Sequence, residues 1–236
     1  VGTAGETPYG TVDASMNFYK FADSTERVGE RLGLVNGRIG PFEDFSIRGF
    51  DTNVAFSDLS VPGRSFRGVK LDAYAVNKDF KYTVFQGHDQ AQFLFITPGI
   101  FDVQKTYIEG ASATLFPEGD HQYTFNFARG YGDYRDNYLK DKVYSVETLQ
   151  RYGDLRISAE TGYDEDVVSS LVRTELNKDR HRLMLNLRDI DGDYVTIVGR
   201  PSNRGEAGGN LNYYFKGTDA RVSSNLDIYR DRLLPN

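Results

Sequence analysis

Alternation of apolar and polar residues is the dominant pattern along this chain. The run from Val69 to Ala75 places an apolar side chain at every second position, a polar turn follows at 77–79, and the run from Phe80 to Val84 resumes the alternation. A period of two sends successive side chains to opposite faces of a β-strand. Two such runs joined by a tight polar turn predict a β-hairpin.

The same pattern recurs over most of the chain and predicts an all-β protein. Four more pairs of alternating runs are separated by tight turns, at 117–120, 153–154, 177–179 and 216–219. The segment 12–18 alternates in the same way, and weaker strands are expected at 28–35 and 45–56. We therefore expect about 12 to 14 antiparallel strands of about 8 to 12 residues each in up-and-down order. Residues 1–236 show no linker, so we expect a single domain, with the Gly-rich segment 199–209 as one of its loops.

Composition narrows the class of protein. The chain holds 16 Tyr, 16 Phe and 24 Gly, which suits strands and turns, and it has no Cys, so disulfides are impossible. The net charge of -6 argues against nucleic acid as a partner, because phosphate binding needs a clustered basic excess. The sequence has no run of the roughly 18 apolar residues that would predict a transmembrane helix.

Charged residues of both signs stand in the middle of the predicted strands, on the polar face. A water-filled lumen accommodates such residues, and so does the wet face of a soluble sandwich. In the last third of the chain, Leu183, Leu185 and Leu187 alternate with Arg182, Asn186 and Arg188. The residues expected to share the polar face are Lys70, Asp72, Arg156, Glu160, Arg182, Arg188, Arg221 and Asp227.

Strand length and loop pattern favour a membrane barrel over a sandwich. A tilted strand crosses the hydrocarbon core in about 9 to 11 residues, which matches the predicted strands. Tight turns are separated by longer connections at 88–105, 131–142 and 199–209. Outer-membrane barrels have short turns at one end and long loops at the other.

In this strand and turn pattern the chain resembles bacterial outer-membrane β-barrel proteins of the porin-like kind. The resemblance implies a closed antiparallel transmembrane barrel in a Gram-negative outer membrane, in contact with lipid and with no cofactor. It implies a diffusion pore for small solutes or ions, lined by the eight charged residues, or a scaffold for a surface complex with other outer-membrane or periplasmic proteins. Two features depart from the family: Trp is absent, and the last residues, Arg232 to Asn236, lack the usual terminal aromatic residue. From that ending we expect the chain to be a fragment or one part of a larger barrel.

The alternative is a soluble, secreted all-β binding module, for example one that binds carbohydrate through Tyr213 and Tyr214. Such a module would need an apolar face buried inside the protein, whereas a barrel would turn that face to lipid. The apolar run Phe93–Ile96 is expected either to pack at the barrel rim or to contact a partner.

Residues that could carry chemistry do not form a recognisable motif. Asp189, Asp191 and Asp193 resemble the start of a calcium loop, but the twelfth position is Arg200, which excludes an EF-hand. We expect a turn with solvated carboxylates there, with a looser surface calcium site as the alternative. The three His are far apart in sequence, and a Glu160–Asp227 acid–base pair has no motif to support it. We therefore expect neither a metal centre nor an enzyme.

Overall fold

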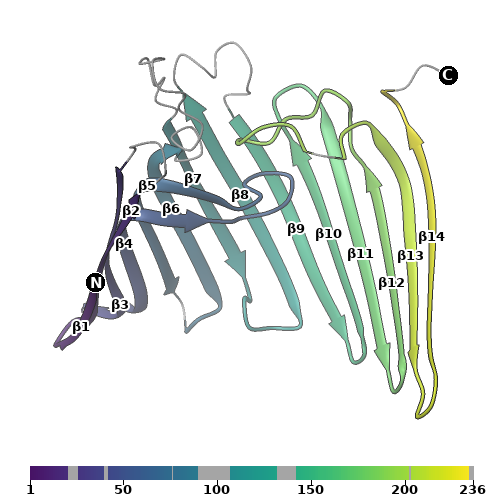
Figure 1. Ribbon diagram of the computed structural model, residues 1–236, viewed down its shortest axis with the longest axis horizontal. Coiled ribbons are helices and arrows are strands. Elements are labelled where there is room, and N and C mark those ends of the chain that lie inside the picture. The colour runs from purple at the N-terminus through teal and green to yellow at the C-terminus, as the bar shows by residue number, and fades with distance from the viewer. Residues whose placement is uncertain are drawn as a thin grey trace.

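The protein is one antiparallel sheet of 14 strands whose spatial order equals their order along the chain (Figure 1). The computed structural model describes residues 1–20, 26–39, 42–75, 77–89, 107–131, 142–201 and 203–233. The strands are β1 (Gly2–Thr7), β2 (Gly10–Lys20), β3 (Glu26–Ile39), β4 (Phe42–Val54), β5 (Arg64–Ala75), β6 (Phe80–Asp89), β7 (Tyr107–Leu115), β8 (His121–Tyr131), β9 (Lys142–Tyr152), β10 (Leu155–Tyr163), β11 (Val168–Lys178), β12 (His181–Asp189), β13 (Glu206–Lys216) and β14 (Arg221–Asp231).

The predicted strand number and the up-and-down order are confirmed. Six strands, β6 to β11, lie between the turns at 77–79 and 179–180, so both turns are at the same end of the sheet. That end also holds the short turns at 8–9, 116–120, 153–154 and 217–220. The long connections 55–63 and 190–205 lie at the opposite end. The long connections predicted at 88–105 and 131–142 fall largely outside the described residues, and the run Phe93–Ile96 falls wholly outside them.

Three local predictions were wrong. Strand β1 was not predicted, because its sequence GTAGET lacks large apolar residues. The Gly-rich segment 199–209 was predicted to be a loop throughout, but β13 begins within it at Glu206. The turn between β11 and β12 lies one step later than predicted, since Lys178 still pairs with His181. Asp179 in that turn has a φ of 52°, in the left-handed region that tight hairpin turns use.

The two faces of the sheet differ in what covers them. We call inner the face that carries Ser145, Glu160 and Leu171, and outer the opposite face. The connection 55–63 folds across the inner face and reaches β8 and β9 in Figure 1. The connection 190–205 packs beside it, and its Ile197 N–H donates to the Ser60 carbonyl oxygen at 3.1 Å.

Two apolar clusters lie between these connections and the sheet. The first joins Val61 and Ile197 of the connections to Phe66, Phe85 and Val143 of the strands. The second joins Leu59, Ile190 and Tyr194 to Leu171 of β11. Among the described residues, both apolar clusters therefore lie on the inner face, at the end of the sheet where the long connections are.

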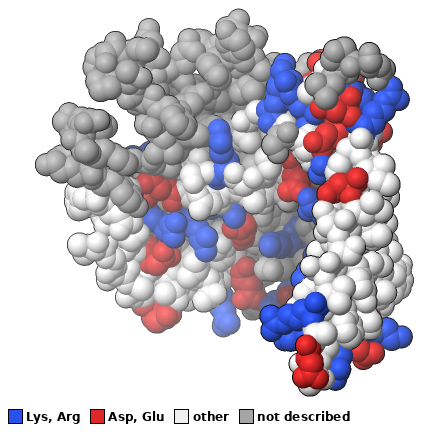
Figure 2. All heavy atoms as spheres, turned by 45° about the vertical axis from the view of Figure 1, so that its right-hand side comes forward, with Lys and Arg blue, Asp and Glu red and all other residues white. Residues whose placement is uncertain are grey.

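The outer face has no such cover among the described residues. Apolar side chains on this face of the C-terminal strands are exposed: Leu187 keeps 44% of its surface, Leu226 keeps 53% and Ile228 keeps 66%. Figure 2 shows an uncharged band over the C-terminal strands, with charged groups gathered above and below it. Charges of both signs are scattered over the hollowed part of the molecule beside this band.

The sheet does not close on itself within the part of the chain that is described. Strands β1 and β14 form its two edges and do not pair with each other. All described positions of β1 are exposed, as are all but Tyr229 in β14. A closed barrel therefore remains a prediction.

Candidate functional site on the inner face

The eight charged residues predicted to share a face do so. Directly opposed residues of an antiparallel pair point to the same side, and the register runs from Lys70 opposite Phe85 in β6 to Asp227 opposite Asn210 in β13. They do not form one cluster, because β5 and β14 lie nine strands apart. Several have local partners: Lys70 is 3.0 Å from Asp72, and Arg182 is 2.8 Å from Glu175. Their role as lumen-lining residues remains a prediction.

The tip of the connection 55–63 is held by side chains of three strands. The Ser57 hydroxyl lies 2.9 Å from that of Ser145 on β9. The Leu59 N–H donates to Oε1 of Glu160 on β10 at 2.7 Å. Asp58 forms an ion pair with Arg173 on β11. Strands β4 and β5 are thus tied to strands four to seven places away in the sheet.

Gly162 makes room for this docking. A Cβ at that position would lie 2.2 Å from the Tyr194 hydroxyl and 2.7 Å from the Leu59 Cβ. Both distances are too short for real carbon contacts, so a larger residue would push the tip off the sheet. The glycine in β10 is therefore a requirement of the inner packing.

The second connection is tied to the first and to the sheet by buried polar groups. The Tyr194 hydroxyl donates to the Leu59 carbonyl oxygen. Asp164 is fully buried; its Oδ2 accepts from the Val195 N–H at 2.8 Å and its Oδ1 from the Val167 N–H at 3.0 Å. Burial, then the carboxylates of Asp164 and Glu160, raise the pKa of the Tyr194 hydroxyl. The phenol therefore stays protonated and keeps its role as donor.

A pair of carboxylates lies beneath the tip. Glu147 of β9 is directly opposite Glu160 of β10, on the same face. The Asn126 amide donates to Glu147 at 2.7 Å and to the Ser145 hydroxyl at 3.0 Å. These groups join the sheet to the docked tip through hydrogen bonds. The sequence alone could not predict these hydrogen bonds, because the tip comes from a segment about 100 residues away.

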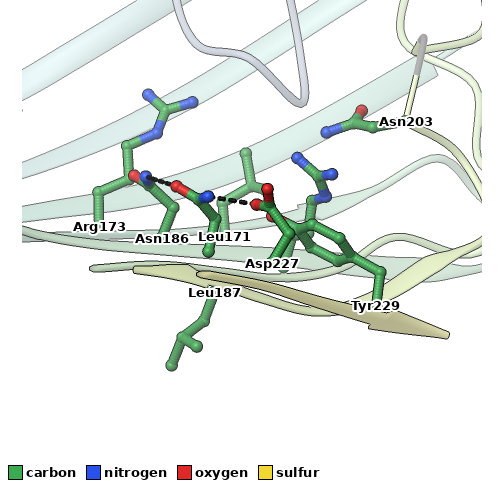
Figure 3. A pocket seen from close by; sticks show the side chains of 9 residues that line it. Leu171, Arg173, Asn186, Leu187, Asn203, Asp227 and Tyr229 are labelled. Atoms are coloured by element: carbon green, nitrogen blue, oxygen red, sulfur yellow. Dashed lines mark hydrogen bonds between the residues drawn. The ribbon is translucent and has the colours of Figure 1, made fainter. Parts of the chain in front are cut away.

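Beyond the tip, the inner wall of β11 to β14 is open and polar. Figure 3 shows Arg173, Asn186, Asp227 and Tyr229 on one side of the sheet, and Leu187 on the other. The Arg188 guanidinium lies 4.0 Å from the centre of the Tyr229 ring. A cavity of about 690 Å³ is bounded by these residues.

Other candidates from the sequence are not brought together. Glu160 on β10 and Asp227 on β14 are four strands apart, roughly 19 Å along the sheet at the usual strand spacing, too far for the two carboxylates of a glycosidase. Tyr213 and Tyr214 are neighbours in β13 and point to opposite faces, so they do not form one platform.

The aspartate-rich turn makes local contacts instead of forming a metal cluster. Asp189 is 2.6 Å from Arg232, and Asp191 accepts the Asp193 N–H at 2.9 Å. No group of three or more His, Cys, Asp or Glu residues in the described ranges is placed to hold a metal ion.

The inward connections are the part of the site that the sequence reasoning missed. One signal was available: Tyr194 to Val198 is a short apolar run inside a segment otherwise rich in Gly, Asp and Arg. Such a run in a solvated loop would be costly, so it could have indicated a loop that packs against the sheet.

Comparison of the chain with protein-family models and with curated proteins found no match to either. Among the described residues, no helix is long and apolar enough to cross a membrane.

Proposed function

We propose that the sheet forms the wall of a β-barrel in a bacterial outer membrane and acts as a diffusion pore for small solutes or ions. The two inward connections, 55–63 and 190–205, narrow the lumen at one end. The eight charged residues of the inner face line this water-filled path. The lipid of the outer membrane contacts the outer face.

The observation that carries the proposal is the polarity of the two faces. Apart from Lys178, Asp189 and Arg230 at or next to the strand ends, the outward positions of β10 to β14 carry no Asp, Glu, Lys or Arg; those of β12 include Leu183, Leu185 and Leu187. The inward positions of the same strands include Arg156, Glu160 and Arg188. A soluble sheet covers its apolar face and exposes its charged face. Here the apolar face is uncovered and the charged face is partly covered, as a lipid-facing wall requires.

Aromatic side chains at both ends of the outer face support the same proposal. Toward the long connections, Tyr144 lies between Phe127 and Tyr163, with ring centres 5.2 Å and 6.5 Å away. Toward the short turns, Tyr123 and Tyr152 are 42% and 57% exposed. Tyr is one of the residues that gather at both membrane–water interfaces, where the ring meets lipid and the hydroxyl meets water.

The proposal has a structural condition. Unpaired backbone groups at a sheet edge are not tolerated in the hydrocarbon. The edges of β1 and β14 must therefore be paired in the membrane, with each other or with other strands. A soluble binding module has no such condition, but it would leave Leu226 and Ile228 in water.

The two inward connections favour a second candidate, a scaffold whose lumen is closed. A scaffold would need detergent for extraction and would show heat-modifiable migration on a gel, as a pore would, but it would not conduct ions. A soluble module would need no detergent and would show no heat-dependent migration.

Conductance of the reconstituted chain in a planar bilayer tests the proposal. We expect ion conductance from the wild type, and a larger single-channel conductance from Gly162→Leu, because the new side chain displaces the tip of 55–63. Gly5→Leu is the matched control, since a Cβ at Gly5 meets nothing within 4 Å. If Gly162→Leu conducts and the wild type does not, the result favours the scaffold. Extraction without detergent and no conductance by either protein would refute a membrane barrel.

A cross-link tests the constriction independently, because the chain has no native Cys. We expect Ser57→Cys with Ser145→Cys to form a disulfide and to hold the conductance at the wild-type level. If this pair does not cross-link, or if Gly162→Leu conducts as the wild type does, the connections do not narrow the pore.

A further inference from the structure

Amide side chains gather on the inner face of the last three strands. Asn186 of β12 is opposite Asn210 of β13, which is opposite Asp227 of β14. One rung nearer the short turns, Asn212 is opposite Asn225. Four amides and one carboxylate thus occupy two successive rungs on one face.

Hydrogen bonds hold these groups in fixed orientations. The Asn210 amide donates to the Asn225 oxygen at 2.6 Å and also to Asp227. The Asn225 amide donates to the other Asp227 oxygen at 2.6 Å, and the Asn212 amide donates to the Asn210 oxygen. An amide has two donor hydrogens and an acceptor oxygen with two lone pairs. Asn210, whose oxygen also accepts from the Asn186 amide at 3.5 Å, uses all of its hydrogen-bonding groups within the cluster. The cluster thus fixes the amide planes, and Asn186, Asn212 and Asn225 each keep a donor hydrogen and acceptor capacity for a ligand.

The charged groups beside the amides are paired with one another. Arg188 forms an ion pair with Glu206, and its guanidinium also lies over the Tyr229 ring. Arg182 pairs with Glu175, and Arg173 pairs with Asp58 of the tip. These three arginines thus each have a carboxylate partner, and three of the four amides offer neutral hydrogen-bonding groups to what passes along the wall.

The space in front of the amides is large enough for a small-molecule ligand. The cavity of about 690 Å³ lies in front of Asn186, Asn210 and Asp227 (Figure 3) and falls within the usual range for ligand sites. A second cavity, of about 520 Å³, lies along Asn212, Tyr214 and Asn225 toward the short turns. From Tyr214 to Gly208 the inner wall extends about 20 Å at the usual rise per residue of a strand.

We infer that this wall is a binding track for neutral, polyhydroxylated solutes, that is, for uncharged oligosaccharides. Adjacent hydroxyls of a sugar each donate and accept, and an amide presents a donor and an acceptor side by side at a similar spacing. Fixed amides bind such a ligand with little loss of side-chain freedom. The inference rests on the proposed pore, because it names the class of solute that would move along the wall.

Titration of the reconstituted chain with maltotriose, cellotriose and raffinose tests the inference. We expect at least one of these trisaccharides to interrupt the ion current in a saturable way. A polyethylene glycol of matched hydrodynamic radius, which lacks adjacent hydroxyls, should give no saturable effect. The same sugars are titrated into detergent-solubilised protein, with tyrosine fluorescence as the readout.

Matched amide variants locate the effect. Asn212→Leu and Asn225→Leu should each raise the half-saturating sugar concentration about tenfold, the effect of losing one or two neutral hydrogen bonds. Asn53→Leu makes the same change on the distant strand β4 and should leave the value unchanged.

Each outcome separates the track from the pore. Conductance without a saturable effect of any of the three sugars, or an equal effect of the polymer, overturns the track and leaves the pore standing. An effect that Asn212→Leu and Asn225→Leu do not change also overturns the track. Absence of conductance overturns the pore. The fluorescence titration then tests the track by itself: saturable binding of a trisaccharide that the amide variants weaken supports the track, and its absence overturns the track.

Discussion

A single glycine shapes the inner wall at its most constrained point. Gly208 in β13 has a φ of +155°, and a Cβ there would lie 2.1 Å from the Ile228 carbonyl oxygen. The Tyr229 ring lies beside the glycine, and Arg188 stacks on that ring from the other side of β13. A residue with a side chain at position 208 would push the Tyr229 ring away from Arg188. The contact between an arginine and an aromatic ring two strands apart thus depends on a missing Cβ.

Neighbouring residues of β12 give a sharp test of which face meets lipid. Leu185 points outward and Asn186 inward. Leu185→Arg should destabilise the protein in lipid by about 2 to 4 kcal/mol, the cost of arginine near the bilayer midplane, and Asn186→Arg by much less. Refolding titrations into lipid vesicles measure both. Equal effects, or a change below about 0.5 kcal/mol at Leu185, would contradict the assignment of the outer face to lipid.

At the level of elements, alternation predicted the strands well and failed where it was absent. The tight turn predicted at 153–154 lies where the structure has it, between the end of β9 and the start of β10, because apolar and polar residues alternate after it. Strand β1 pairs with β2 along its whole length but lacks the large apolar residues that carry this signal. The tight turns were recognisable because Asn, Asp and Gly tolerate positive φ; Asn77 and Gly153 adopt 54° and 58°.

The shared end of the short turns leads to a labelling prediction. Cysteines in place of Lys78 and Lys178 should both be protected from an impermeant thiol reagent on whole cells, because short turns of outer-membrane barrels face the periplasm. Asp193→Cys, in the connection 190–205 at the opposite end, is the labelled control. Labelling of only one of the two turn positions would contradict the up-and-down order in the membrane.

At the scale of the whole molecule, the sequence could not reveal what fills the inner face. Each hairpin is a local event, and its pattern can be found in consecutive residues. The contacts of Leu59 with Glu160 and Tyr194 join segments 101 and 135 residues apart, and no periodicity records such a meeting. The polar inner positions were predictable for the same reason as the strands, whereas the amide cluster of β12 to β14 needed the register between three strands.

Charge on the inner face should set ion selectivity. Arg156 and Arg182 point inward, and fixed charge nearest the ion path dominates permeation. We expect a mild anion preference from the wild type and a shift of the reversal potential toward cations, under a salt gradient, for Arg156→Glu with Arg182→Glu.

A control variant separates position from net charge. Lys178→Glu with Arg230→Glu changes the net charge by the same amount. Both residues lie on the outer face near the ends of β11 and β14, so this double variant should leave the reversal potential unchanged. If both double variants shift it equally, selectivity follows net charge, and the inward arginines have no special role.

The docked tip of 55–63 also has a consequence for how the chain assembles. The sheet consists of hairpins whose partners are close in sequence, so their loop-closure entropy is small and they can form early. The bonds from Ser57, Leu59 and Tyr194 span about 90 to 135 residues and require β9 to β11 to be in place first. The inner connections therefore belong to a late-forming cooperative unit, which can open while the wall stays folded, since few of the backbone hydrogen bonds of the sheet depend on it.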